Sequence, residues 1–234
     1  MKTSHLYILI IACTLSMVSC SGEDIFSTAT TIKVVNLIKG EDDIIIKIGD
    51  TPINYTTTEA KVAFEGYRNV SILEGVNKKI KIVKKSDTIS PIYSEILNLK
   101  DIHSLYVFGN KNESDAFLIE DQLKQYTDSI VGVRFINVSK LAGPIAVNIV
   151  GGSTVITGLD QESATDFIEF PATAADGSYT FEFKDTSGNL LNTVTLDPLE
   201  NRNIAAKKNL TFAIYDFQIN DFVTFQRIFR VNSY

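Results

Sequence analysis

The chain has 234 residues, of which 44% are hydrophobic, and its 22 Lys and Arg against 28 Asp and Glu give a formal net charge of −6 at pH 7. This length suits one large domain or two ordinary ones, and the apolar content, with only 5 Pro and 13 Gly, argues against low-complexity disorder. The acidic balance disfavours nucleic acid as a partner, because an acidic surface repels phosphate backbones.

The first twenty residues have the pattern of a secretion signal. Lys2 precedes an apolar run over residues 6–18, which is shorter than the ~20 residues that a membrane-spanning helix needs. The run ends in Ser19 and Cys20, a small residue before Cys that resembles a bacterial lipobox. The resemblance implies a signal peptide over 1–19 and a lipid on Cys20, with ordinary cleavage near Ser19 or a signal anchor as the alternatives.

The residue after Cys20 is Ser21 rather than Asp, which in such signals points to the outer membrane, and the acidic stretch 22–24 (GED) resembles the surface-export signals of some outer-membrane lipoproteins. We therefore expect a membrane partner through a lipid anchor at Cys20, and a polar tether over residues 20–30. Cys13 leaves with the signal, so the mature chain keeps no thiol for a disulfide, a zinc site or a nucleophile.

The mature chain contains the same sequence pattern twice, as two repeats. Residues 32–37 (IKVVNL) and 133–138 (VRFINV) are apolar stretches with Asn36 and Asn137 near their ends, and each is followed by a polar loop and a second apolar run, 44–48 or 145–150. The pattern predicts a first domain over 31–123, a linker over 124–129 and a second domain over 130–234.

Short apolar segments typical of strands recur in the first repeat, at close to the 8–12-residue spacing of a β-sandwich. Thr-rich residues 56–63 predict an edge strand, and Gly75 and Asn77 predict a hairpin-like connection between strands near residues 70–72 and 80–82. Further strands are expected at 92–99, 105–108 and 117–119. Polar residues 120–128 predict either one helical turn or a simple linker.

The second repeat continues the same pattern. Asp176 and Gly177 form a strong hairpin signal before a strand that places Tyr179, Phe181 and Phe183 on one face. Further strands are predicted at 167–170, 190–196 and 210–215, with a hairpin turn over 187–189. The last stretch, 222–231, has phenylalanines at helical spacing, but its β-branched residues favour a strand.

The motifs at 134–138 (RFINV), 176–183 (DGSYTFEF) and 210–215 (LTFAIY) resemble the DUF4397 family of repeated domains in bacterial envelope proteins. The first repeat diverges, with Lys33 where the family motif has Arg and NKKIKI at 77–82 in place of a Gly-led hairpin. The resemblance implies an all-β chain of two tandem immunoglobulin-like antiparallel β-sandwich domains. It implies no activity, because the family has none established.

Candidates for chemistry are few. His103 is the one histidine of the mature chain and has no partner motif, so a turn or strand-edge role is the simpler interpretation. Residues 151–154 (GGST) have phosphate-cradle composition but no following Lys or helix, which favours a hairpin turn.

Carboxylates and tyrosines leave two binding hypotheses open. Two close carboxylates suffice for a glycosidase, and Glu41–Asp43 could hold Ca²⁺, although acids also populate β-turns. The acidic clusters are Glu41, Asp42 and Asp43; Asp160, Glu162 and Asp166; Asp197 and Glu200; and Asp216 and Asp221. Sugar platforms in this Trp-free chain would be tyrosines, namely Tyr55, Tyr67, Tyr93, Tyr106, Tyr126 and Tyr234.

The sequence thus predicts a non-catalytic binding, adhesion or spacer module without a cofactor or metal, whose glycan or protein ligand it does not identify. A carboxylate-based hydrolase is the first alternative, and two close carboxylates with aromatics in one pocket would favour it. A structural or accessory subunit of an envelope assembly is the second, and an exposed unpaired edge strand would favour it.

Overall fold

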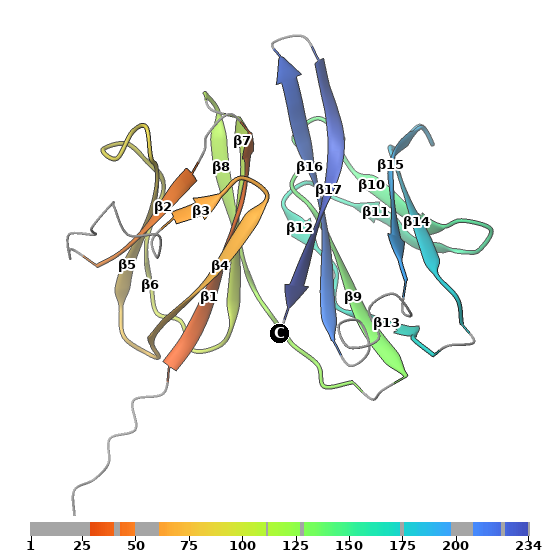
Figure 1. The fold of residues 1–234 in the computed structure, drawn as a ribbon, viewed down its shortest axis with the longest axis horizontal. Coiled ribbons are helices and arrows are strands. Elements are labelled where there is room, and N and C mark those ends of the chain that lie inside the picture. The colour runs from red at the N-terminus through yellow and green to blue at the C-terminus, as the bar shows by residue number, and fades with distance from the viewer. Residues whose placement is uncertain are drawn as a thin grey trace, which may run out of the picture.

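The computed structural model describes residues 29–39, 43–49, 61–110, 112–126, 129–173, 176–197, 208–220 and 223–233. These ranges contain 17 strands and no helix, so the all-β prediction is confirmed. The strands form four sheets, which lie as successive layers in Figure 1. Cys20 and the rest of the predicted signal and most of the tether fall outside the described residues.

Strands β1–β8 form the first two layers. The outer N sheet has the order β3 (Lys61–Ala63), β2 (Asp43–Ile48), β5 (Lys78–Lys84) and β6 (Pro91–Leu97). The inner N sheet has the order β4 (Gly66–Leu73), β1 (Ala29–Lys39), β7 (His103–Asn110) and β8 (Ser114–Glu120). Alternating aliphatic residues of the two sheets meet in one buried cluster, as the period of two in these strands requires.

Strands β9–β17 form the other two layers. The inner C sheet has the order β12 (Ser163–Ala164), β9 (Ile130–Asn137), β16 (Asn209–Asn220) and β17 (Val223–Ser233), and β13 (Ile168–Pro171) also pairs with β9. The outer C sheet has the order β11 (Thr154–Leu159), β10 (Ile145–Ile149), β14 (Tyr179–Lys184) and β15 (Leu190–Leu196). Their cluster is aromatic, with the Phe135 ring 5.2 Å from that of Phe181 and 5.8 Å from that of Phe183.

A third buried cluster joins the two inner sheets. Val35 and Tyr106 of the inner N sheet belong to the same cluster as Ile136 and Tyr215 of the inner C sheet, and all four are 0% exposed. The inner sheets are therefore buried on both faces. Burial on both faces explains why β1 and β9 carry nearly continuous apolar runs.

The two halves repeat one local structure at Asn36 and Asn137. Each side-chain oxygen accepts a hydrogen bond from the amide two residues on, at 3.0 Å from Ile38 and 3.1 Å from Ser139. Each backbone carbonyl accepts one from a glutamate with positive φ, namely Glu65 (φ 54°, 2.8 Å) and Glu162 (φ 52°, 2.7 Å). Asn137 ends β9, whereas β1 continues to Lys39 because it stays paired with β7.

Pairing differs from the expected antiparallel scheme at one place in each half. β1 runs parallel to β7, and β9 runs parallel to β16, while the other pairs are antiparallel. In each half the chain passes through the outer sheet between these two strands, so it returns to the inner sheet in its first direction.

Two predicted hairpins are wrong. The turn at Gly75 joins β4 of the inner N sheet to β5 of the outer N sheet, and the turn at Gly177 joins β13 to β14 across the two C sheets. The turn residues reverse the chain in both places, but their strands pair elsewhere. The predicted hairpin over 187–189 joins β14 to β15, and the last stretch is the strand β17, as predicted. β11 and β12 were not predicted.

Candidate functional site

Five polar residues lie buried where the inner sheets meet, and they form what we name the interface ion cluster. It consists of Lys33, Ser104, Asp121, Arg134 and Thr211, which are 0–5% exposed. Lys33 on β1 and Arg134 on β9 occupy equivalent positions in the two repeats, three residues before Asn36 and Asn137. Asp121 comes from the segment that connects the halves, so the connection itself supplies the acid between the two cations.

Asp121 is fully satisfied. One carboxylate oxygen lies 2.6 Å from Nη2 of Arg134, and the other accepts a hydrogen bond of 2.6 Å from the Ser104 hydroxyl. Arg134 also donates through Nε to the Thr211 hydroxyl at 3.3 Å. A buried ion pair is compatible with folding only when such additional hydrogen bonds offset the loss of hydration.

Lys33 extends across the boundary between the halves. Its amino group donates to the carbonyl of Asn232 on β17 at 2.7 Å and lies 5.2 Å from the centre of the Tyr67 ring. Its pKa is lowered to about 8: burial is the largest cause and the charge of Arg134 adds to it, while the charge of Asp121 acts in the opposite direction. The amino group thus satisfies part of the outer edge of β17, which no strand covers.

Asp121 and Arg134 are engaged with each other and with neighbouring hydroxyls. Both oxygens of Asp121 are occupied, and burial raises the pKa of Tyr106 beside them to about 12, which keeps that phenol neutral. The Ser104 hydroxyl does lie against the Asp121 carboxylate, but both residues are 0–5% exposed and that carboxylate is also paired with Arg134. The geometry is that of a buried contact that holds the two halves together rather than that of a reacting centre.

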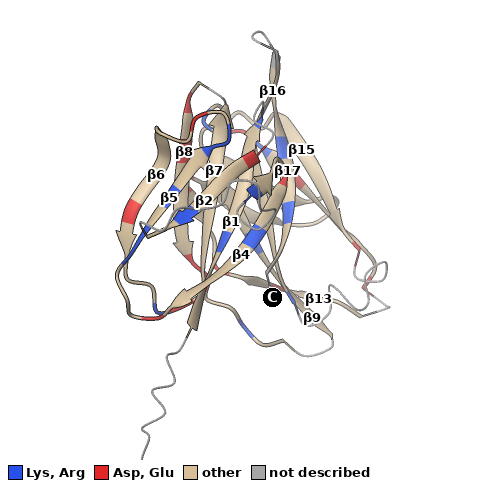
Figure 2. Cartoon of the chain, turned by 60° about the vertical axis from the view of Figure 1, so that its left-hand side comes forward, with Lys and Arg blue, Asp and Glu red and all other residues tan. Residues whose placement is uncertain are grey.

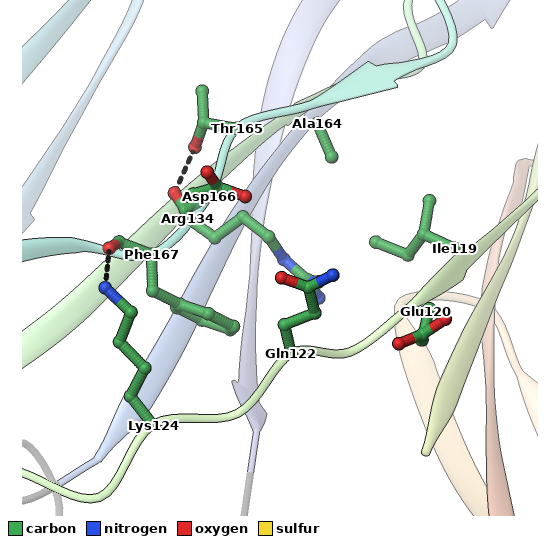
Figure 3. Close-up of a pocket in the computed structure, with 9 residues that line it drawn as sticks. All are labelled: Ile119, Glu120, Gln122, Lys124, Arg134, Ala164, Thr165, Asp166 and Phe167. Atoms are coloured by element: carbon green, nitrogen blue, oxygen red, sulfur yellow. Dashed lines mark hydrogen bonds between the residues drawn. The ribbon is translucent and has the colours of Figure 1, made fainter. Parts of the chain in front are cut away.

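A cavity of about 230 Å³ opens beside this cluster (Figure 3). Figure 3 shows Glu120 at the end of β8 and Gln122 of the connecting segment on one side, and Asp166 and Phe167 of the second half on the other. The guanidinium of Arg134 lies 4.8 Å from the centre of the Phe167 ring. The volume is below the 300–1,000 Å³ typical of ligand pockets.

The other end of the boundary is closed by charges and loops. Lys140 reaches from the second half to Glu113 (3.3 Å) and Asp115 (3.6 Å) of the β7–β8 turn. Asp216 accepts hydrogen bonds from the Ser139 hydroxyl (2.5 Å) and the Lys140 amide (2.7 Å). Asp216, which belongs to a predicted acidic cluster, therefore fixes a loop.

Glu65 ties the halves together through its strained turn. Its carboxylate accepts a hydrogen bond from the Tyr215 hydroxyl and lies 3.0 Å from Nη2 of Arg227. Burial, and then the hydrogen bond to Glu65, raises the pKa of Tyr215. The positive φ of Glu65 places its side chain toward the second half, which gives this conformation a packing role.

The residues singled out from the sequence are dispersed. His103 begins β7 and lies with Nδ1 2.8 Å from the carbonyl of Asp101, and Asp43 pairs with Lys85 at 3.3 Å. Residues 151–153 turn β10 into β11, as the hairpin interpretation predicted, with Gly151 at φ 72°. Among the described residues, no group of three or more His, Cys, Asp or Glu is placed to hold a metal ion.

Several other candidate residues are buried or lie outside the described part of the chain. Tyr106 is 0% exposed and offers no platform for a sugar, whereas Tyr67 is 42% exposed. Cys20, Glu41, Asp42, Tyr55, Glu200, Asp221 and Tyr234 lie outside the residues whose side chains the structure describes. Sequence reasoning missed Lys33, Asp121 and Arg134 as a site, although a cation at the same place in two apolar strands was a usable signal.

No helix in the described ranges is long and apolar enough to span a membrane. No protein-family model and no curated protein matches the chain. The resemblance to DUF4397 domains therefore rests on the motifs and their layout alone.

Proposed function

We propose that this chain is a lipid-anchored protein of the outer membrane or cell surface, with two tandem immunoglobulin-like β-sandwiches of the DUF4397 type. The sandwiches act together as one stiff, non-catalytic unit for binding, adhesion or spacing. The observation that carries the proposal is the boundary between the inner sheets, where an apolar cluster and the interface ion cluster are buried together. If the two sandwiches were independent domains joined by a flexible linker, Lys33, Asp121 and Arg134 would be exposed to water.

The stiff-unit proposal is tested by calorimetry on the full chain. One transition whose calorimetric and van't Hoff enthalpies agree is expected, because the halves share a buried boundary. Two separate transitions at different temperatures contradict it.

The anchor is tested by cell fractionation of Cys20→Ser. Replacing the acylated sulfur removes the lipid, and the protein is expected to leave the membrane fraction for the soluble one. Ser21→Ala, a change one residue away, is the control that stays with the membrane. A Cys20→Ser protein that still fractionates with membranes refutes the anchor.

A carboxylate-based hydrolase remains the second candidate, because the cavity of Figure 3 brings Glu120 and Asp166 to one opening beside Phe167. The fit is poor, since the Phe167 ring lies against Arg134 and the cavity is small for a sugar ring and a water. Turnover of a panel of chromogenic glycosides, lost in both Glu120→Gln and Asp166→Asn, would establish it.

The accessory-subunit alternative finds less support in β17 than its position at a sheet edge suggests. Asn192 of β15 donates to the carbonyl of Gln226 at 2.7 Å, and Lys33 donates to that of Asn232. Side chains thus occupy two of the outward carbonyls to which an added strand would have to bond.

A further inference from the structure

The outer face of the outer N sheet carries a group of lysines, which we name the lysine face. Ile44, Ile46, Ile80 and Ile82 of β2 and β5 point into the core, so the residues that alternate with them lie on the opposite face, where the pair Ile45 and Val83 is itself only 1% exposed. That face therefore holds Lys47, Lys79 and Lys81, together with Lys61 of β3, whose neighbour Val62 is in the core. Figure 2 shows this side of the molecule, with blue segments on β2 and β5.

Strand register brings these charges together. Lys47 lies directly opposite Lys81 on the two central strands of the sheet, and Lys79 lies two residues along from Lys81. Neighbouring strands are about 4.8 Å apart, and like charges directly opposite each other destabilise a sheet. Lysines that protect a sheet from edge-to-edge pairing belong on edge strands, so that role does not account for β2 and β5.

The described strands of this sheet bring few acids near the lysine face. The four strands contain six lysines and two acids, Asp43 and Glu95. Asp43 pairs with Lys85, and Glu95 lies on the same face of β6 as Tyr93 and Leu97, which pack toward the core, and not on the lysine face. Within the described ranges, Lys61, Lys79 and Lys81 form no ion pair with a carboxylate.

The outer C sheet shows that this charge is local. Its strands contain one lysine and one acid, Lys184 and Glu182, which pair with each other at 2.7 Å. Although the chain has a net charge of −6, the described strands thus gather lysines on one of its two outer faces. Such a patch attracts anions of extended form.

We propose that the lysine face binds an anionic polysaccharide, one that carries carboxylate or sulfate groups. Among the described residues of the four strands, the face presents no aromatic ring for base stacking, because Tyr93 packs toward the core, and this disfavours single-stranded nucleic acid. Ile96 is the one large apolar side chain strongly exposed on these four strands, which is too little for the apolar centre of a protein interface.

Sheet shape separates the polysaccharide from a lipid surface. Neighbouring strands rotate by about 20–25°, so the amino groups on β3, β2 and β5 follow a twisted surface. A flexible linear polymer can follow that twist, whereas a flat bilayer meets only part of it. The amino group of Lys47 also donates to the carbonyl of Thr88 at 3.1 Å, which holds one of the charges in place.

The test measures equilibrium binding of the full chain, in a non-ionic detergent, to heparin and to polygalacturonate, with neutral dextran as the blank. The variant is Lys79→Gln/Lys81→Gln, and the control is Lys184→Gln/Lys208→Gln, which changes net charge equally in the second half of the chain. The variant is expected to bind about tenfold more weakly, and its slope of log K against log salt is expected to fall by about 2, while the control keeps both values.

Three results overturn the proposal: no binding of either polyanion above dextran, equal weakening by variant and control, or binding of phosphatidylglycerol vesicles or single-stranded DNA without binding of the polysaccharides. Circular dichroism of both doubles checks that they fold. The inference deepens the binding role proposed above by naming a ligand class, and the two fail separately. Polysaccharide binding is measured in detergent solution, whereas anchoring is read from Cys20→Ser and stiffness from calorimetry.

Discussion

Asp121→Ala is expected to destabilise the whole chain far more than an average substitution. The change removes the one acid of the interface ion cluster and leaves Arg134 and Lys33 as buried cations. It also leaves the Ser104 hydroxyl, 0% exposed, without its acceptor. Breaking a buried ion pair by removing one partner lowers the free energy of unfolding by about 3–5 kcal/mol.

The size of this effect separates a buried lock from an ordinary surface pair. Asp115, whose side chain is 50% exposed, lies 3.6 Å from Lys140 across the same boundary. Asp115→Ala is therefore the matched control, and a surface pair of this kind contributes about 0–1 kcal/mol. For a chain of this length, 3–5 kcal/mol corresponds to a fall in Tm of about 6–20 °C.

Urea unfolding followed by circular dichroism measures both variants, and a double-mutant cycle of Asp121→Leu, Arg134→Leu and the double variant isolates the pair. Asp121→Leu/Arg134→Leu is expected to be more stable than either single variant, because it leaves neither of these two charges buried alone. A loss below 1 kcal/mol in Asp121→Ala, or additive losses in the double variant, would refute the buried-lock reasoning.

Two further expectations concern the same boundary. The pKa of Lys33 is about 8 in the fold against 10.5 for a free lysine, so the unfolded chain binds more protons than the folded chain between these pH values. Wild type is therefore expected to gain stability relative to Lys33→Met as the pH rises from about 8 to about 10. Urea titrations at several pH values measure this, and the raised pKa of Tyr106 acts in the opposite sense only above about pH 10. A Cβ at Gly132 would lie 2.3 Å from the Tyr126 hydroxyl, so Gly132→Ala is expected to lose about 1–3 kcal/mol in wild type and far less beside Tyr126→Ala. Equal losses in both backgrounds would show that the ring is not the cause.

Local periodicity was sufficient to predict most strands. Alternation in β14 and the β-branched run in β2 follow from the sequence alone, and so does the strand nature of β17, where β-branched residues outweigh phenylalanines at helical spacing. β12 is only two residues long and too short to leave a pattern.

Sheet membership was beyond the reach of the same reasoning. The turns at Gly75 and Gly177 specify a change of direction, and both glycines have positive φ, but nothing local determines which strand the next segment will pair with. That choice depends on contacts between residues distant in sequence, such as the parallel pairing of β1 with β7. The two failed hairpins are failures of this kind.

At the boundary between the inner sheets, part of the structure could be predicted from local pattern and part depended on contacts between distant residues. The apolar runs around Lys33 and Arg134 were visible, and they exceed what a strand with one solvated face requires. Their meaning depended on Asp121, which lies in a stretch that reads as a polar linker. A carboxylate there becomes an interface residue only because the two repeats each place a cation at the equivalent position of the first inner strand. Duplication alone would have produced two cations facing each other, so the acid supplied by the connection allows the two copies to pack as one body.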